Sequence, residues 1–175
     1  MRISQRLALV TATCVAAFCG TAVAETKVEI KKTHVCCGAC ESAVAKVLEK
    51  AGVKGSADQA TTTITFTASD DKAAQKVVDE LAAAGFHGDT GSKDITVKDD
   101  SGVKEGKVTK LTLTGLHNCC GACTKAIKEA LKKVDGIESD DTKSKSETIT
   151  ITGNFDGKAA VKALNDAGFH AKEKK

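Results

Sequence analysis

One internal repeat constrains the fold of this chain more than any other feature. The segment HVCCGAC at residues 34–40 recurs as HNCCGAC at residues 117–123, and AGFH at residues 84–87 recurs at residues 167–170. Both pairs are separated by 83 positions. Two matches that lie far apart at one offset indicate a duplicated structural unit. The chain is therefore expected to fold as two copies of one small domain.

Each copy shows the pattern strand, helix, strand, strand, helix, strand. In the first copy, apolar and polar residues alternate over residues 61–67, which is typical of a strand, and apolar residues recur at helical spacing over 43–51 and 73–81. The second copy repeats this pattern with strands around 108–113 and 149–151 and helices around 126–134 and 160–164. With right-handed crossovers, this order predicts an α+β fold with two tandem ferredoxin-like βαββαβ domains, each a four-stranded antiparallel sheet covered on one face by two helices.

The ends of the first copy are less regular. A short final strand is expected from Phe86, and residues 94–103 fit neither copy and are interpreted as an extra strand leading into a linker. His87 and His170 follow the two copies of the Ala-Gly-Phe segment and are interpreted as surface histidines of the final strands. The predicted organisation is a signal peptide at 1–24, a first domain at 25–98, a linker at 99–106 and a second domain at 107–175.

The first 24 residues are typical of a cleaved export signal. Arg2 and Arg6 precede an apolar stretch over residues 7–18, and the small residues at 22–24 form a cleavage site before Glu25. The apolar stretch is shorter than the roughly 20 residues that a membrane-spanning helix needs, which disfavours a membrane anchor. We therefore expect a periplasmic or secreted protein with no membrane insertion after cleavage.

Removal of this segment changes the charge and the cysteine count. Without Arg2 and Arg6, the chain keeps 24 lysines and no arginine against 23 acidic residues. Nucleic-acid-binding proteins usually display clustered Lys and Arg, so a nucleic-acid partner is disfavoured. Cys14 and Cys19 are lost as well. The remaining cysteines form two clusters of three: Cys36, Cys37 and Cys40, then Cys119, Cys120 and Cys123.

Each cluster lies where the first strand of its copy leads into the first helix. Free N–H groups and the helix dipole stabilise thiolates at such a position, and thiolates are ligands for Cu(I), Zn(II) and similar soft ions. A neighbouring histidine could complete a Cys₃His set, although adjacent cysteines of an extended loop point in different directions. The predicted metal ligands are Cys37, Cys40, Cys120 and Cys123, followed by Cys36 and Cys119 and then by His34 and His117.

The strand, the Cys-x-x-Cys loop and the helix ending in Ala-Gly-Phe together resemble the heavy-metal-associated (HMA) domain family, twice over nearly the whole mature chain. This family includes copper chaperones and the periplasmic mercury-binding protein. Its two metal-binding cysteines match the Cys-x-x-Cys of each copy. Its methionine, which packs in the core beneath the loop, is replaced by Val35 and by Asn118, and the polar Asn118 fits that place poorly. The added His and Cys of both copies depart from the family signature and bear on the choice of metal.

The resulting hypothesis is an exported protein, not an enzyme, that acts as a carrier, scavenger or buffer of soft metal ions. It would bind about one ion per repeat, Cu(I) foremost, with Zn(II) or Hg(II) as alternatives, and a metal-transport protein is a candidate partner. The main alternative is a periplasmic thiol–disulfide oxidoreductase, because Cys-x-x-Cys at a helix start is also the layout of such enzymes. The chain contains no proline, whereas the thioredoxin-like fold places a cis-proline at its active site.

Overall fold

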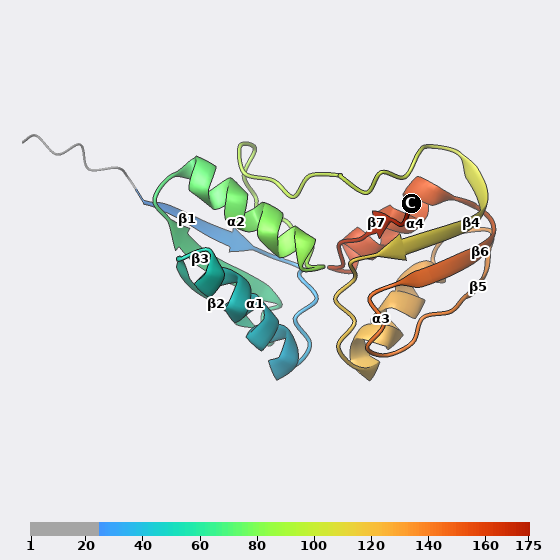
Figure 1. Ribbon diagram of the computed structural model, residues 1–175, viewed down its shortest axis with the longest axis horizontal. Coiled ribbons are helices and arrows are strands. Elements are labelled where there is room, and N and C mark those ends of the chain that lie inside the picture. The colour runs from blue at the N-terminus through green and yellow to red at the C-terminus, as the bar shows by residue number, and fades with distance from the viewer. Residues whose placement is uncertain (1–24) are drawn as a thin grey trace, which may run out of the picture.

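Two α+β units follow one another along the chain and lie side by side in the computed structural model (Figure 1). The structure describes residues 25–175, so the predicted signal peptide at 1–24 lies outside the described residues. Within that described range, no helix combines the length and the apolar character that crossing a bilayer requires.

The first unit contains three strands and two helices. Its antiparallel sheet has the order β1-β3-β2, and α1 and α2 pack against one face (Figure 1). Alternate residues of β3, such as Ile64 and Phe66, are buried against the helices, as the period-two pattern of the sequence requires. Asp70 caps α2 by accepting a hydrogen bond from the Ala73 N–H. The elements are β1 (Thr26–Ile30), α1 (Gly38–Lys50), β2 (Lys54–Asp58), β3 (Thr63–Ala68) and α2 (Asp71–Ala83).

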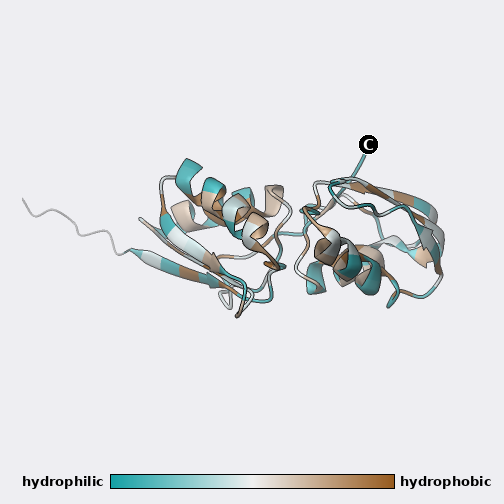
Figure 2. Ribbon diagram, turned by 90° about the horizontal axis from the view of Figure 1, so that it is seen from below, coloured by the Kyte–Doolittle hydropathy of each residue, from teal (hydrophilic) through white to brown (hydrophobic). Residues whose placement is uncertain are grey.

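The second unit repeats this arrangement with a complete fourth strand. Its antiparallel sheet has the order β5-β6-β4-β7, which is the order of the ferredoxin-like fold. The helices alternate between hydrophilic and hydrophobic stretches, as Figure 2 shows, because only one side of each contacts the sheet. The elements are β4 (Lys107–Thr114), α3 (Gly121–Leu131), β5 (Ile137–Asp140), β6 (Ile149–Asp156), α4 (Gly157–Asp166) and β7 (Lys172–Glu173).

Two strand predictions for the first unit are wrong. The chain after α2 adds no fourth strand to the first sheet, and only an isolated bridge joins Lys31 to Asp89. Residues 94–103 form no strand either, because side chains and one β7 N–H, that of Glu173, bind most of their backbone, and no strand of the described chain runs beside them. The side chain of Gln75 on α2 bonds both the N–H and the carbonyl of Thr96, and Asp99 pairs with Lys158 on α4. This segment therefore crosses from the first unit to the second as an ordered strap.

The two copies of the Ala-Gly-Phe-His segment join the units to each other. Phe86 and Phe169 form an antiparallel bridge. The His87 N–H donates to the Gly168 carbonyl at 3.0 Å, and the His170 N–H donates to the Gly85 carbonyl at 3.0 Å. The contact is thus symmetrical between the repeats, like the interface of a twofold dimer.

Only glycine fits at the centre of this contact. Gly85 and Gly168 have φ angles of +88° and +87°, in the left-handed region that glycine favours. A Cβ atom on Gly85 would lie 2.2 Å from the backbone nitrogen of His117, and one on Gly168 would lie 2.2 Å from that of His34. The two glycines let the end of each second helix approach the cysteine loop of the other unit.

Candidate metal centre

The cysteine loops lead directly into α1 and α3. Cys37 and Cys120 are the N-cap residues, both extended, and neither uses its side chain to cap the helix. The Cys37 carbonyl instead accepts the N–H of Cys40 at 2.9 Å. The N-cap sulfurs are therefore free to face the ends of the helices, where the dipole favours a thiolate.

Three sulfur atoms converge within each unit. The cysteine in the first helical turn, Cys40 or Cys123, is fully buried and lies close to both other cysteines of its loop. The Sγ–Sγ distances are 3.7 Å for Cys36–Cys40, 3.7 Å for Cys37–Cys40, 3.6 Å for Cys119–Cys123 and 3.7 Å for Cys120–Cys123. The expectation that adjacent cysteines would point to different places is thus not met, because the loop bends where the helix begins.

The two sets of three also meet each other across the interface. We call the group of Cys36, Cys37, Cys40, Cys119, Cys120 and Cys123 the six-cysteine centre. The Sγ–Sγ distances between units are 3.7 Å for Cys36–Cys120, 3.6 Å for Cys36–Cys123, 3.6 Å for Cys37–Cys119 and 3.6 Å for Cys40–Cys119. All six thiols are free, so no disulfide occupies the described part of the chain. The predicted ligands of both repeats therefore form one site.

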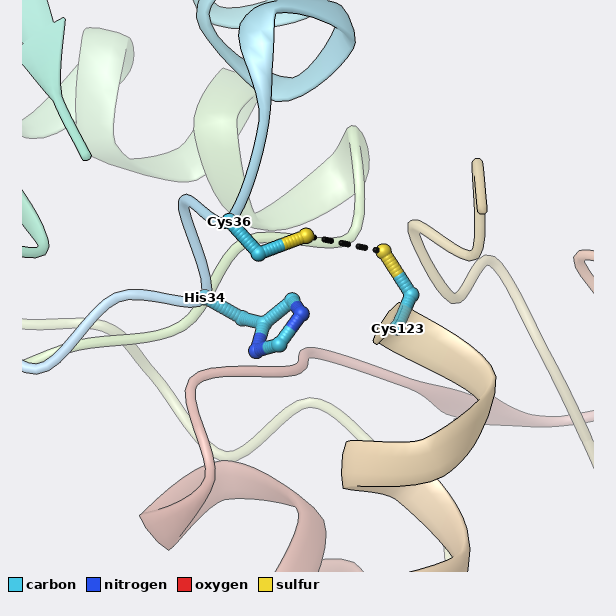
Figure 3. A group of neighbouring side chains, drawn as sticks. All are labelled: His34, Cys36 and Cys123. Carbon is cyan, nitrogen blue, oxygen red and sulfur yellow. Dashed lines mark hydrogen bonds between the residues drawn. The ribbon is translucent and has the colours of Figure 1, made fainter. Parts of the chain in front are cut away.

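His34 and His117 flank this centre. A ring nitrogen of His34 and the sulfurs of Cys36 and Cys123 all lie within 4.8 Å of one another (Figure 3). Each ring stacks on a phenylalanine of the other unit, with centroids 4.2 Å apart for His34–Phe169 and 4.5 Å apart for Phe86–His117. In both histidines the Nε2 atom is buried and has no hydrogen-bond partner among the described residues. Such unpartnered buried nitrogens suit either a metal ligand or a donor to a thiolate.

The family resemblance places Phe86 and Phe169 where related domains carry a residue that faces the metal loop, but it did not predict that each ring stacks on a histidine of the other unit. The signal that could have found them is the identity of AGFH in two copies that differ at most other positions.

The pKa values of the thiols are shifted in opposite directions. The pKa of Cys40 is held well below its usual range, chiefly by the neighbouring Cys123 thiol, and the pKa of Cys123 is raised, chiefly by Cys40. The pKa of Cys120 is lowered to about 7, chiefly by the backbone N–H of Cys123 in the first helical turn. Burial raises the pKa values of Cys36 and Cys119. The metal-free centre therefore shares protons between sulfurs, and metal binding would displace these protons.

Asn118 fits beneath its loop, contrary to the expectation from its polarity. It is buried, and its amide nitrogen donates to the Lys143 carbonyl at 2.8 Å and to the Ser146 carbonyl at 3.2 Å. Its amide oxygen accepts the Thr124 hydroxyl at 3.0 Å. Because every polar atom has a partner, the cost of burial is offset. Val35 fills the same place in the first unit with a purely apolar contact.

The prediction that His170 is a surface histidine is wrong. Only 3% of its surface is exposed, its Nε2 lies 2.7 Å from Asp100, and its Nδ1 lies 3.4 Å from Nδ1 of His87. The bridge between Phe86 and Phe169 places the two histidines against each other, and the strap carrying Asp100 covers them. This pair is separate from the six-cysteine centre but belongs to the same interface.

The histidine pair should make the stability of the metal-free protein depend on pH. The pKa of His87 is lowered from 6.5 to about 4, first by burial and then by the neighbouring His170, while the smaller attraction of Asp166 and Asp99 acts in the opposite direction. Between these pH values His87 is protonated in the unfolded chain and neutral in the folded chain. The contribution of His87 to the free energy of unfolding is therefore complete above pH 6.5 and is lost as the pH falls to about 4. Denaturant unfolding of the reduced protein at several pH values should show this fall, and His87→Gln should flatten it. An equally steep fall in the variant would contradict this assignment.

A comparison with protein families agrees with the second cysteine loop. The family model for the heavy-metal-associated domain matches residues 116–170, which span most of the second unit. Among solved structures, the chain is similar to the N-terminal soluble domains of Bacillus subtilis CopA, with 18% sequence identity over 87% of this chain and 95% of that chain and a TM-score of 0.32. No curated protein sequence matches the chain.

Proposed function

Because residues 116–170 form a heavy-metal-associated domain and the first unit repeats its metal loop, we propose that this chain is an exported protein that binds soft metal ions. The observation that carries the proposal is the convergence of six thiol sulfurs at the junction of the units. Thiolates in that number select soft ions over Mg²⁺ or Ca²⁺, which prefer oxygen ligands. Export would follow from the predicted signal peptide.

The arrangement of the ligands favours Cu(I) over Zn(II). Within residues 25–175, the sets of mutually close ligand atoms have three members each, such as Cys36, Cys37 and Cys40. Zn(II) generally takes four ligands in a tetrahedron, whereas triangles of thiolates suit an ion of lower coordination number. Either loop alone supplies one such triangle, which accounts for the expected minimum of one ion per repeat.

The position of the centre between two units favours holding a metal over rapid exchange. Cys40 and Cys123 are fully buried, the other four cysteines are half-buried, and each histidine ring stacks on a phenylalanine of the other unit. Release of a bound ion would break its bonds to cysteines of both units. A scavenger or buffer fits this arrangement better than a carrier that passes its ion to a transport protein at each encounter.

An oxidoreductase finds less support, since heavy-metal-associated domains are usually non-catalytic metal binders. A redox-active Cys-x-x-Cys also needs one exposed sulfur that a substrate disulfide can reach. Here each such pair faces the cysteines of the other unit.

Anaerobic titration of the reduced protein tests the proposal. We expect Cu(I) to bind in competition with a Cu(I) chelator, and Zn(II) to be displaced by Cu(I) when both are present, because the sulfur triangles lack a fourth close thiolate. The measurements are the metal-to-protein ratio after gel filtration and the sulfur-to-metal charge-transfer absorbance. Absence of binding of Cu(I), Zn(II) and Hg(II) at micromolar concentration would refute metal binding. Turnover in a disulfide-exchange assay comparable to that of a dedicated oxidoreductase would favour the alternative function.

A further inference from the structure

The six sulfurs of the centre have the connectivity of an octahedron. Eight Sγ pairs lie 3.6–3.7 Å apart. Four more pairs lie within 4.8 Å: Cys36–Cys37, Cys37–Cys120, Cys119–Cys120 and Cys40–Cys123. Each sulfur is thereby close to four of the other five. In three pairs of the described sulfurs the two atoms are not close to each other, and these pairs correspond to opposite corners of the octahedron. They are Cys36–Cys119, Cys37–Cys123 and Cys40–Cys120.

This connectivity offers triangles of sulfur and no tetrahedron, because any four corners of an octahedron include an opposite pair. Four of the eight triangular faces can be chosen so that no two of them share an edge. Every sulfur then belongs to two of these four faces. One such set is Cys36–Cys37–Cys40, Cys37–Cys119–Cys120, Cys40–Cys119–Cys123 and Cys36–Cys120–Cys123. Three of these faces combine cysteines of both units.

We propose that the six-cysteine centre holds one cluster of four Cu(I) ions shared by the two units. Each ion is bound by the three thiolates of one face, and each thiolate bridges two ions. This inference rests on the proposed binding of soft metal ions and goes beyond it, because two independent Cys-x-x-Cys sites would hold one ion each. Copper stays Cu(I) throughout, and the protons of the thiols that are not yet ionised pass to solvent.

The size of the face formed by Cys36, Cys120 and Cys123 agrees with three-coordinate Cu(I). An ion at the centre of this triangle, whose edges are 3.6–3.7 Å, lies about 2.1 Å from each sulfur, close to the roughly 2.3 Å of a metal–thiolate bond. Bonds of about 2.3 Å would lengthen its edges to about 4.0 Å. This face therefore needs to expand by only a few tenths of an ångström, and the sulfurs of each of the other three faces lie within 4.8 Å of one another.

The charge of this partly buried site also favours four ions over two. Six thiolates with two Cu(I) ions carry a net charge of −4, whereas six thiolates with four Cu(I) ions carry −2, and uncompensated buried charge is costly. The unpartnered Nε2 atoms of His34 and His117 can offset part of the remainder by donating N–H bonds to the cluster. Among the described residues, the lysine side chains that form hydrogen bonds donate them to oxygen atoms and none donates to any of the six sulfurs, so metal ions are the main source of positive charge there.

Native mass spectrometry during an anaerobic Cu(I) titration of the full mature chain tests this inference. The expected result is a dominant species with four coppers that builds up at the expense of the metal-free chain, with little of the one-, two- and three-copper forms. Copper X-ray absorption should then count about three sulfurs per copper and show copper–copper scattering. Saturation at any number other than four would overturn the cluster, and stepwise binding of two ions with two sulfurs each would leave the proposed function intact. Absence of bound copper would overturn the cluster, and only absence of bound Zn(II) and Hg(II) as well would refute the proposed function.

A pair of double variants sharpens the test. Cys36→Ser with Cys119→Ser removes one opposite pair but keeps both Cys-x-x-Cys loops, so saturation should fall from four ions to two and lose its cooperativity. The matched control is Ala39→Ser with Ala122→Ser, which adds the same hydroxyls at exposed positions of the same loops and should still take up four. Four ions in the first variant would overturn the bridging role of Cys36 and Cys119. If that variant fails to fold, as circular dichroism would reveal, the stoichiometry of the unaltered chain decides.

Discussion

Replacing both Cys40 and Cys123 by serine should weaken Cu(I) binding by roughly four orders of magnitude. These two sulfurs are the fully buried members of the centre, and each lies within 3.7 Å of both other cysteines of its own loop. Four-ligand zinc sites bind with about 10–16 kcal/mol, so one thiolate contributes about 3 kcal/mol, or roughly 100-fold, and two contribute twice that free energy. Competition against Cu(I) chelators of graded affinity measures the loss.

The control for this variant is again Ala39→Ser with Ala122→Ser, which should bind as the unaltered chain does. Circular dichroism and thermal unfolding must accompany the comparison, because a serine hydroxyl at a fully buried position also costs stability when it lacks a partner. If Cys40→Ser with Cys123→Ser folds and retains the affinity of the unaltered chain, then the two helix-start cysteines are not metal ligands.

The second large effect is expected at the interface between the units. Gly85→Ala with Gly168→Ala should drive the units apart, because each new Cβ would lie 2.2 Å from a backbone nitrogen of the opposite metal loop, and backbone cannot yield as a flexible side chain can. Small-angle X-ray scattering should then show a larger radius of gyration. The cooperative uptake of four Cu(I) ions should give way to independent binding of one ion per unit.

A matched control separates the clash from the cost of the left-handed backbone. Gly52 and Gly102 also have positive φ angles, +70° and +71°, but a Cβ atom there meets nothing within 4 Å. Gly52→Ala with Gly102→Ala should therefore lose about 1–2 kcal/mol of stability per site from backbone strain and keep both the compact shape and the copper stoichiometry. A compact Gly85→Ala/Gly168→Ala variant that still takes up four coppers would show that the contact between the Ala-Gly-Phe-His segments does not hold the centre together.

Local pattern was sufficient to predict the units themselves. Alternating residues such as Ile64 and Phe66 indicated a half-buried strand, and the helical spacing after each cysteine loop indicated the helices that follow. The position of Cys37 and Cys40 at a helix start followed from the same pattern. The absence of a fourth strand in the first unit could not be predicted in this way, because His87 pairs with Gly168 of the other unit and only Asp89 bridges back to Lys31.

The buried polar residues mark where local pattern was insufficient. Asn118 and His170 were judged by polarity and strand period, which carry no information on partners far away in the sequence. The partners of Asn118 are carbonyls 25 and 28 positions away, and those of His170 lie 70 and 83 positions away. Burial of a polar group is decided by such partners, because its cost depends on whether each donor and acceptor is satisfied.

The sequence by itself determined two copies of one α+β unit, the three thiols at the start of each first helix, and the chemical class of ion that such thiols select. Only the tertiary structure decided that the six thiols form a single centre. The physical reason is that periodicity and motif spacing act within about one element, whereas the distance from Cys36 to Cys123 depends on how two complete units dock. That docking depends on the close backbone approach at Gly85 and Gly168. The repeated AGFH segments make this approach possible, but their sequence alone does not predict it.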